Sequence, residues 1–104
     1  MAAVFTLLAH AGRGPDDGLP EGATGAALLC YASGRDEAEA VRETAAILKQ
    51  AGLSVLEIEG HGTLEDREAE GHEIGEEDRA LMRRAEEENA VIVAELTPLF
   101  GDGA

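Results

Sequence analysis

Short apolar runs alternate with longer polar segments along the chain, and their periods predict four strands. Residues 4–9 and 26–32 are continuous apolar runs of strand length. In residues 53–59 the side chains of Val55, Leu56 and Ile58 are apolar and those of Glu57 and Glu59 are polar, and residues 90–96 are rich in β-branched residues, which favours two further strands. We therefore expect a sheet built from these four segments.

Two other segments have the period of an amphipathic helix. The first begins near Asp36 and ends at Gly52, and its apolar residues recur three and four positions apart. The second spans residues 76–89, with acidic residues in its first turn, where the helix dipole favours them. Residues 60–75 are left unassigned: a capping-box pattern at Thr63 could open one helical turn, but the segment is polar and bounded by glycines. The positions that we expect to face the core are Ala38, Val41, Ala45, Ile47 and Leu48 in the first helix, and Ala80, Leu81, Ala85 and, at the margin, Met82 in the second.

This order of elements predicts one domain of the α+β class over residues 1–104. We expect the strand–helix–strand segment 26–59 to form a right-handed crossover between two parallel strands. Both helices would then cover one face of a four-stranded sheet, a two-layer sandwich that is ferredoxin-like or a close variant. The alternative is a small three-layer Rossmann-like unit with helices on opposite faces.

Two segments lack the pattern of regular structure. Residues 10–25 contain five glycines and two prolines, which predicts a long and mobile loop between the first two strands. The last residues, 101–104, predict a frayed tail.

Alternation along the strands predicts an apolar sheet face that the two-layer fold leaves uncovered. Such a face is typical of an interface, so we expect a homodimer through the sheet; a three-layer fold would cover it and allow a monomer. The set expected beneath the helices is Phe5, Leu7, Leu28, Cys30, Leu56, Ile58, Ile92, Ala94 and Leu96. The uncovered set is Val4, Thr6, Leu8, Leu29, Tyr31, Val55, Glu57, Val91, Val93 and Glu95.

The charge of the chain excludes several classes of partner. It has 22 acidic and 8 basic side chains, a formal net charge of −14. Its field would repel nucleic acids and anionic membranes, which bind through Lys and Arg. No apolar run reaches the roughly 20 residues of a membrane span, and one cysteine provides no disulfide framework. We therefore expect a soluble cytoplasmic protein.

The sequence does not match the familiar catalytic and cofactor-binding motifs at every position that they require. Asp17 interrupts the dinucleotide-binding glycine pattern, and Glu76 stands where a zinc-protease motif needs its second histidine. Cys30 lies in the middle of a predicted strand, where a thiol acts as a small hydrophobic side chain. The sequence indicates no cofactor.

The remaining candidates for a site are polar residues that follow the strands. His10 follows the first strand, His61 follows the third, and Ser33, Gly34 and Arg35 follow the second. If the strands end at one edge of the sheet, these residues would meet there, beside the N-terminus of the Asp36 helix, which favours a small anion. A weaker candidate is a metal site at His61 and His72, within a segment rich in carboxylates.

Two functions follow from these candidates. The favoured one is a non-catalytic homodimeric module that binds a ligand or another protein. The alternative is a small enzyme at the sheet edge, with His10 or His61 as general base and Arg35 holding an anion.

Overall fold

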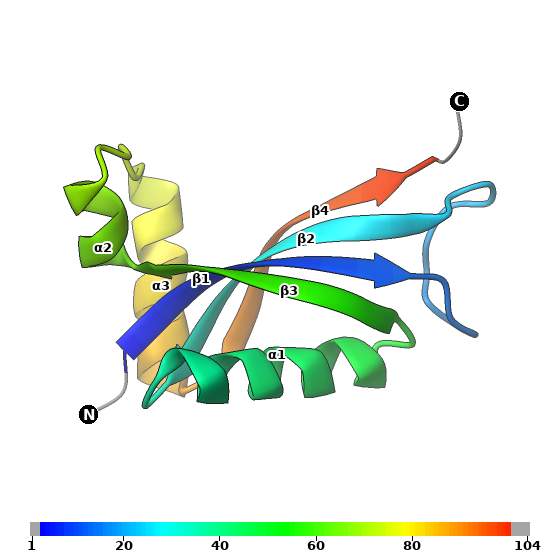
Figure 1. The fold of residues 1–104 in the computed structure, drawn as a ribbon, viewed down its shortest axis with the longest axis horizontal. Coiled ribbons are helices and arrows are strands. Elements are labelled where there is room, and N and C mark those ends of the chain that lie inside the picture. Colours follow the sequence, from blue (N-terminus) through cyan, green and yellow to red (C-terminus); the bar gives the residue numbers. More distant parts are fainter. Residues whose placement is uncertain (1–2, 101–104) are drawn as a thin grey trace.

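The computed structural model describes residues 3–100, which form a four-stranded antiparallel sheet and three helices (Figure 1). The predicted strands and both long helices are present, and the strands extend by a few residues beyond their predicted ends. The elements in chain order are β1 (Ala3–Gly12), β2 (Gly25–Gly34), α1 (Glu37–Gln50), β3 (Ser54–Thr63), α2 (Leu64–Ala69), α3 (Glu76–Glu88) and β4 (Val91–Leu99). The predicted tail, residues 101–104, lies outside the described residues.

The strand order is β3-β1-β2-β4, and β1 and β2 form a long hairpin. Their register runs from Ala3 opposite Gly34 to Gly12 opposite Gly25. β3 pairs with the other side of β1, also antiparallel. Strands β2 and β3 therefore run in the same direction with β1 between them. The predicted parallel orientation of the two strands joined by the first helix is therefore present, with β1 inserted between them.

Helix α1 covers one face of the sheet. Its N-cap is Asp36, whose side chain accepts a hydrogen bond from the Glu39 amide. Three side chains one turn apart are buried, Ala40, Thr44 and Leu48, and Ala38 is exposed, so the buried stripe is rotated from the predicted one. The cluster beneath the helix consists of Leu7, Ala9, Ala11, Ala26, Leu28, Cys30, Ala32, Ala40, Leu48 and Leu53.

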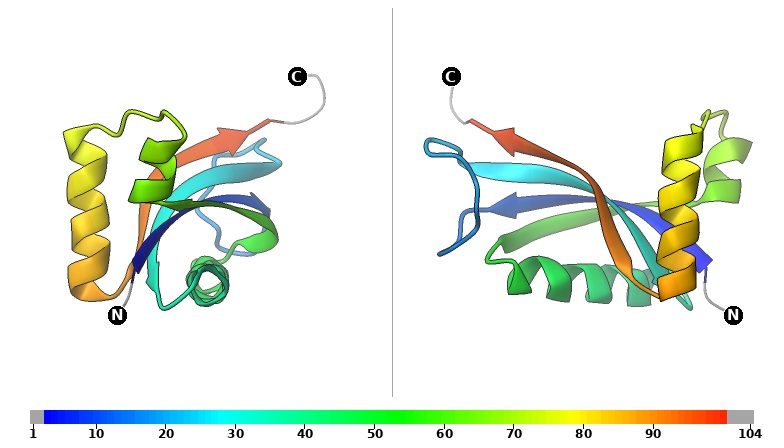
Figure 2. Two further views of the ribbon diagram at one scale, coloured as in Figure 1. Left: turned by 60° about the vertical axis from the view of Figure 1, so that its left-hand side comes forward. Right: turned by 180° about the vertical axis from the view of Figure 1, so that it is seen from behind.

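Helices α2 and α3 pack against the opposite face, at the end of the sheet where β1 begins (Figure 2). Tyr31, which points away from the α1 cluster, packs there with Ile74, Met82 and Ala85. In the segment that the sequence left unassigned, Thr63 and Asp66 form a capping box that starts α2. The expectation that both helices share one face, leaving the other uncovered, is therefore wrong at this end.

Two β-bulges break the alternation on which the predicted faces depended. The register between β1 and β3 shifts at Leu56, so Val55 packs into the α1 cluster and Leu56 itself is 70% exposed. The register between β2 and β4 shifts at Ala94, which places Val93 on the α1 face and Ile92 on the α3 face. One extra residue reverses the parity of every position after it. The predicted face is wrong for these residues.

The predicted α+β class is confirmed, and the ferredoxin-like assignment is not. Helix α1 and the sheet form a two-layer sandwich, to which α2 and α3 add cover on the other face. The Rossmann-like alternative would also place helices on both faces of the sheet. It requires parallel strand pairs, however, and every observed pair is antiparallel. Within residues 3–100, no helix is long and apolar enough to cross a membrane.

Candidate functional site

The strand register separates His10 from Arg35, two of the residues that were expected to share a sheet edge. Arg35 follows Gly34, which lies opposite Ala3, whereas His10 lies opposite Ala27 and Glu57. The distance from Ala3 to His10 is seven residues along β1, roughly 23 Å at the rise of an extended strand. His10 therefore lies towards the end of the sheet opposite Arg35. No site can combine the two side chains in this conformation.

His10 and His61 have different surroundings. The His10 side chain is 42% exposed, and its Nδ1 lies 3.8 Å from Glu57 Oε2 across the β1–β3 pair. His61 lines a shallow depression with Asp66 and Glu70 beside α2. Within residues 3–100, the polar side chains beside the two imidazoles are carboxylates: Glu57 beside His10, and Asp66 and Glu70 beside His61. We find no arrangement here for general-base catalysis.

Ser33 and Gly34 have structural roles at the end of β2. The Ser33 side chain lies 3.0 Å from Asn89 Oδ1, to which its hydroxyl donates a hydrogen bond, and this bond ties β2 to the left-handed C-cap of α3. A Cβ on Gly34 would lie 2.9 Å from the backbone nitrogen of Ala40. Glycine at this position lets α1 lie directly on the strand end.

The positive charge of Arg35 and the N-terminus of α1 are already neutralised by the chain. Arg35 Nη2 lies 2.8 Å from Glu39 Oε2, and the backbone amide of Arg35 donates to Glu39 Oε1. This guanidinium and amide hold the pKa of Glu39 below its ordinary value. The Asp36 side chain accepts a hydrogen bond from the backbone amide of Glu39, at the N-terminus of α1. An external anion would have to displace these carboxylates, so the structure offers no support for an anion at this terminus.

The two other residues with possible chemistry, His72 and Cys30, also lack the surroundings of a metal ligand or a reactive nucleophile. His72 Nε2 lies 3.9 Å from Glu70 Oε1, and among residues 3–100 no group of three or more His, Cys, Asp or Glu side chains could hold a metal ion. Cys30 is fully buried beneath α1, and burial raises the pKa of its thiol to about 11. The thiol is therefore protonated at neutral pH and poorly nucleophilic.

A buried polar network that the sequence analysis missed joins α2 and α3 to the sheet. The Tyr31 hydroxyl donates to Asp78 Oδ1 at 2.8 Å, and Arg67 Nη1 donates to Thr6 Oγ1 at 3.3 Å. Tyr31 and Thr6 are 1% and 2% exposed. The network fixes the helices that form one wall of the pocket described next.

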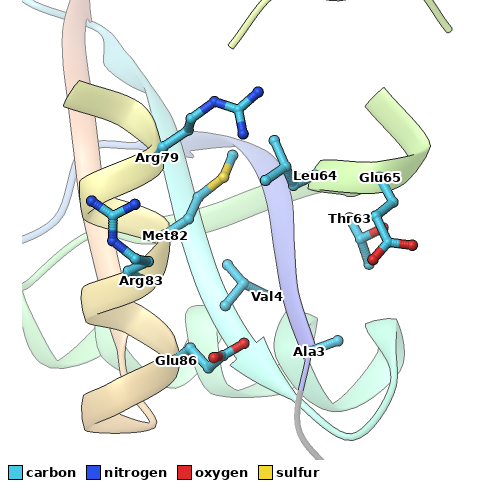
Figure 3. A pocket seen from close by; sticks show the side chains of 9 residues that line it. All are labelled: Ala3, Val4, Thr63, Leu64, Glu65, Arg79, Met82, Arg83 and Glu86. Atoms are coloured by element: carbon cyan, nitrogen blue, oxygen red, sulfur yellow. The ribbon is translucent and has the colours of Figure 1, made fainter. Parts of the chain in front are cut away.

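That pocket lies between α3, the first residues of β1 and the start of α2, and we call it the α3–β1 pocket (Figure 3). Its volume is about 480 Å³. Apolar side chains from three elements form its floor, and charged side chains of both signs surround its opening. The lining residues are Ala3, Val4, Thr63, Leu64, Glu65, Arg79, Met82, Arg83 and Glu86.

A sequence signal for this pocket exists in hindsight. Arg79, Met82, Arg83 and Glu86 follow the three- and four-residue spacing of one helix face. Two arginines on one face stand out in a segment in which acids outnumber bases. The partners from β1 and α2 could not be identified without the tertiary fold.

The loop between β1 and β2 is organised by Asp17. The Asp17 side chain, 3% exposed, accepts hydrogen bonds from Arg13 and from the amides of Gly14 and Leu19. These donors hold the pKa of Asp17 far below its ordinary value. Arg13 also donates to the Ala23 carbonyl oxygen at 2.8 Å. The loop thus has internal contacts that its composition does not indicate.

A comparison with known protein families gives one match. The model of a family described as a domain of unknown function (DUF8846) matches residues 4–100. No curated protein and no solved structure matches the chain.

Proposed function

The chain belongs to the family of domains of unknown function DUF8846, and from its own geometry we propose a non-catalytic protein-interaction module that forms a homodimer. The interface is the outer edge of β4, where two copies of the strand would pair antiparallel about a two-fold axis. One observation carries this proposal: the open edge of β4 exposes apolar side chains.

Strand β4 is at the end of the sheet and pairs only with β2. Val93 is 41% exposed and Leu96 is 44% exposed, and both lie on the α1 face at this edge. Ile47 on α1 is also 41% exposed. Natural proteins usually protect an edge strand with charges, bulges or a covering segment. An edge with exposed aliphatic side chains is therefore a good candidate for pairing with a second copy.

The other edge of the sheet is less suited to pairing. Strand β3 has two irregularities in its register with β1, against one bulge in β4, and it exposes two carboxylates, Glu57 and Glu59, against Glu95 in β4. The Glu37 side chain also lies against its backbone at Gly60. This contrast favours β4 as the interface, and it also provides a control position, because the bulged Leu56 on β3 is 70% exposed.

The test is the mass of the particle in solution, measured by light scattering after size-exclusion chromatography. We expect a dimer, and we expect Leu96→Glu to convert it to a monomer by placing a charge in the interface. The matched control, Leu56→Glu, should leave the dimer intact. A monomer at high micromolar concentration, or a dimer that survives Leu96→Glu, would exclude this interface.

The alternative of a small enzyme has no comparable observation in its favour. Two of its three residues, His10 and Arg35, lie towards opposite ends of the sheet, and Arg35 is already paired with Glu39. We also propose a cytoplasmic location, which the single buried thiol of Cys30 supports, since disulfides are rare in that compartment.

A further inference from the structure

We propose that the α3–β1 pocket binds a small apolar zwitterion of the amino-acid type, with Arg83 and Glu86 recognising its two charges. The site is separate from the β4 edge and does not depend on dimer formation. The size of the pocket, its apolar floor and the charges at its opening support this class of ligand.

The floor of the pocket suits a small apolar side chain. Met82 is 5% exposed, and Val4 and Leu64 are partly buried beside it. Figure 3 shows these three side chains between α3 and the elements opposite, β1 and α2. The volume of about 480 Å³ lies within the range of small-molecule sites, which are concave and mostly apolar. An apolar group placed here would lose contact with water on several sides.

The opening of the pocket has charged groups of both signs that are not paired with each other. Arg79 is already bound, since its Nε donates to the Ile74 carbonyl oxygen at 3.0 Å and its Nη2 contacts Glu68. The side chains of Arg83 and Glu86 form no hydrogen bond or ion pair within residues 3–100. The Glu65 side chain, which also lines the pocket, is likewise unpaired within residues 3–100. One cation and two carboxylates are therefore free to bind a ligand.

Overall charge decides which kind of ligand fits Arg83 and the two carboxylates. The net charge of −14 opposes the approach of an anion, although Arg83 would bind its carboxylate. A cation would be attracted by the same field but would leave Arg83 facing a like charge. A zwitterion has no net charge, and its ammonium and carboxylate groups can satisfy Glu86 and Arg83 together. Charge-assisted hydrogen bonds of this kind are the strong ones in recognition.

The experiment compares three related probes: L-phenylalanine, its amide (a cation) and its N-acetyl derivative (an anion). Binding is followed by calorimetry and by amide chemical shifts of Val4, Leu64 and Met82, at probe concentrations up to about 10 mM. We expect L-phenylalanine to bind about tenfold more tightly than either derivative, and to shift these amides.

Substitutions on α3 test which residue binds the carboxylate of the ligand and which binds its ammonium group. Arg83→Ala should weaken L-phenylalanine about tenfold and leave the amide derivative within about twofold. Glu86→Ala should weaken L-phenylalanine equally and leave the N-acetyl derivative unchanged. The controls are Arg84→Ala, whose arginine pairs with Glu88, and Glu87→Ala; neither residue lines the pocket.

Three outcomes would overturn the proposal. Equal affinity for all three probes would mean that the pocket recognises only the apolar group. Equal losses in the Arg83 variant and the Arg84 control would mean that general charge acts rather than contact. Absence of any shift at Val4, Leu64 and Met82 would mean that such zwitterions do not bind there.

Discussion

The hydroxyl of Tyr31 lies 2.8 Å from Asp78 Oδ1, and this hydrogen bond joins β2 to the first turn of α3. The Tyr31 side chain packs with Ile74, Met82 and Ala85. Burial, and then the carboxylate of Asp78, raise the pKa of Tyr31 to about 12, against an opposing effect of Arg67. The bond therefore holds α3, one wall of the α3–β1 pocket, against the sheet.

The first prediction concerns the substitution Tyr31→Phe, which removes this hydroxyl and keeps the ring. We expect the free energy of unfolding at neutral pH to fall by about 1 kcal/mol, since the carboxylate of Asp78 loses its donor. Urea unfolding measures this loss. Removal of the buried ring should have a larger effect, so we expect Tyr31→Ala to lower the free energy of unfolding by about 3–5 kcal/mol.

The second prediction is the pH dependence that the same group causes. Its pKa is raised from an ordinary value of 10.0 to about 12 in the folded state, so folding favours the protonated phenol. The resulting stability is fully present below pH 10 and is lost as the pH rises towards 12. Between these values the parent should lose stability more steeply than Tyr31→Phe. Parallel curves for the two proteins would contradict the assigned shift.

The third prediction tests how firmly the loop between β1 and β2 packs. A Cβ on Gly14 would lie 1.9 Å from the carbonyl oxygen of Gly52, at the turn between α1 and β3. If the loop is held in this position, Gly14→Ala should cost about 1–3 kcal/mol, as overpacking does. The control is Gly12→Ala, whose Cβ would meet only the Leu56 side chain at 3.6 Å. Equal stability of the two variants would favour the mobile loop that the composition predicts.

Amide exchange gives a fourth prediction for the same loop, at single residues. The amides of Gly14 and Leu19 donate to Asp17, so we expect them to exchange slowly. Gly18 and Gly22, which have positive φ angles, should exchange faster at the outer turns. In Asp17→Ala the protection at Gly14 and Leu19 should disappear. Uniformly fast exchange in the parent would show that the loop is mobile as a whole.

The local hydrophobic pattern of the sequence was sufficient to predict the strands and the long helices, but not how the strands pair. Period and capping residues identified both long helices and the four strands, and they left the short helix α2 undecided. They did not indicate that β1 would lie between β2 and β3, because a long loop is compatible with a hairpin or with a distant strand. The bulges at Leu56 and Ala94 follow from pairing geometry and have no marker in the sequence.

The candidate site depended on that pairing and was therefore the least predictable feature. His10 and Arg35 were expected together only because their strands were expected to end at one edge. The hairpin reverses β1 and moves His10 towards the other end of the sheet. The α3–β1 pocket combines residues more than 70 positions apart in sequence, such as Val4 and Arg79. Helix periodicity carries a signal for the α3 side of the pocket, which the sequence analysis did not use, and carries none for the other side.

The fifth prediction concerns the ionic strength dependence of the proposed homodimer. Each copy has a net charge of −14, and Glu95 lies on the strand that would pair with its equivalent. Repulsion between two such copies is screened by salt, with a Debye length of about 10 Å at 0.1 M and about 3 Å at 1 M. The apolar contacts of Val93 and Leu96 are not weakened by salt. We therefore expect the dimer to become more stable as salt increases.

Light scattering over a dilution series, at low and at high salt, measures this effect. Glu95→Gln should reduce the salt dependence by removing two like charges from the interface. The control is Glu57→Gln, which removes the same number of charges from the outer strand β3, away from the proposed contact. Its salt dependence should remain close to that of the parent. A dimer that dissociates with added salt would mean that ion pairs hold it together, and this would contradict an apolar β4 edge.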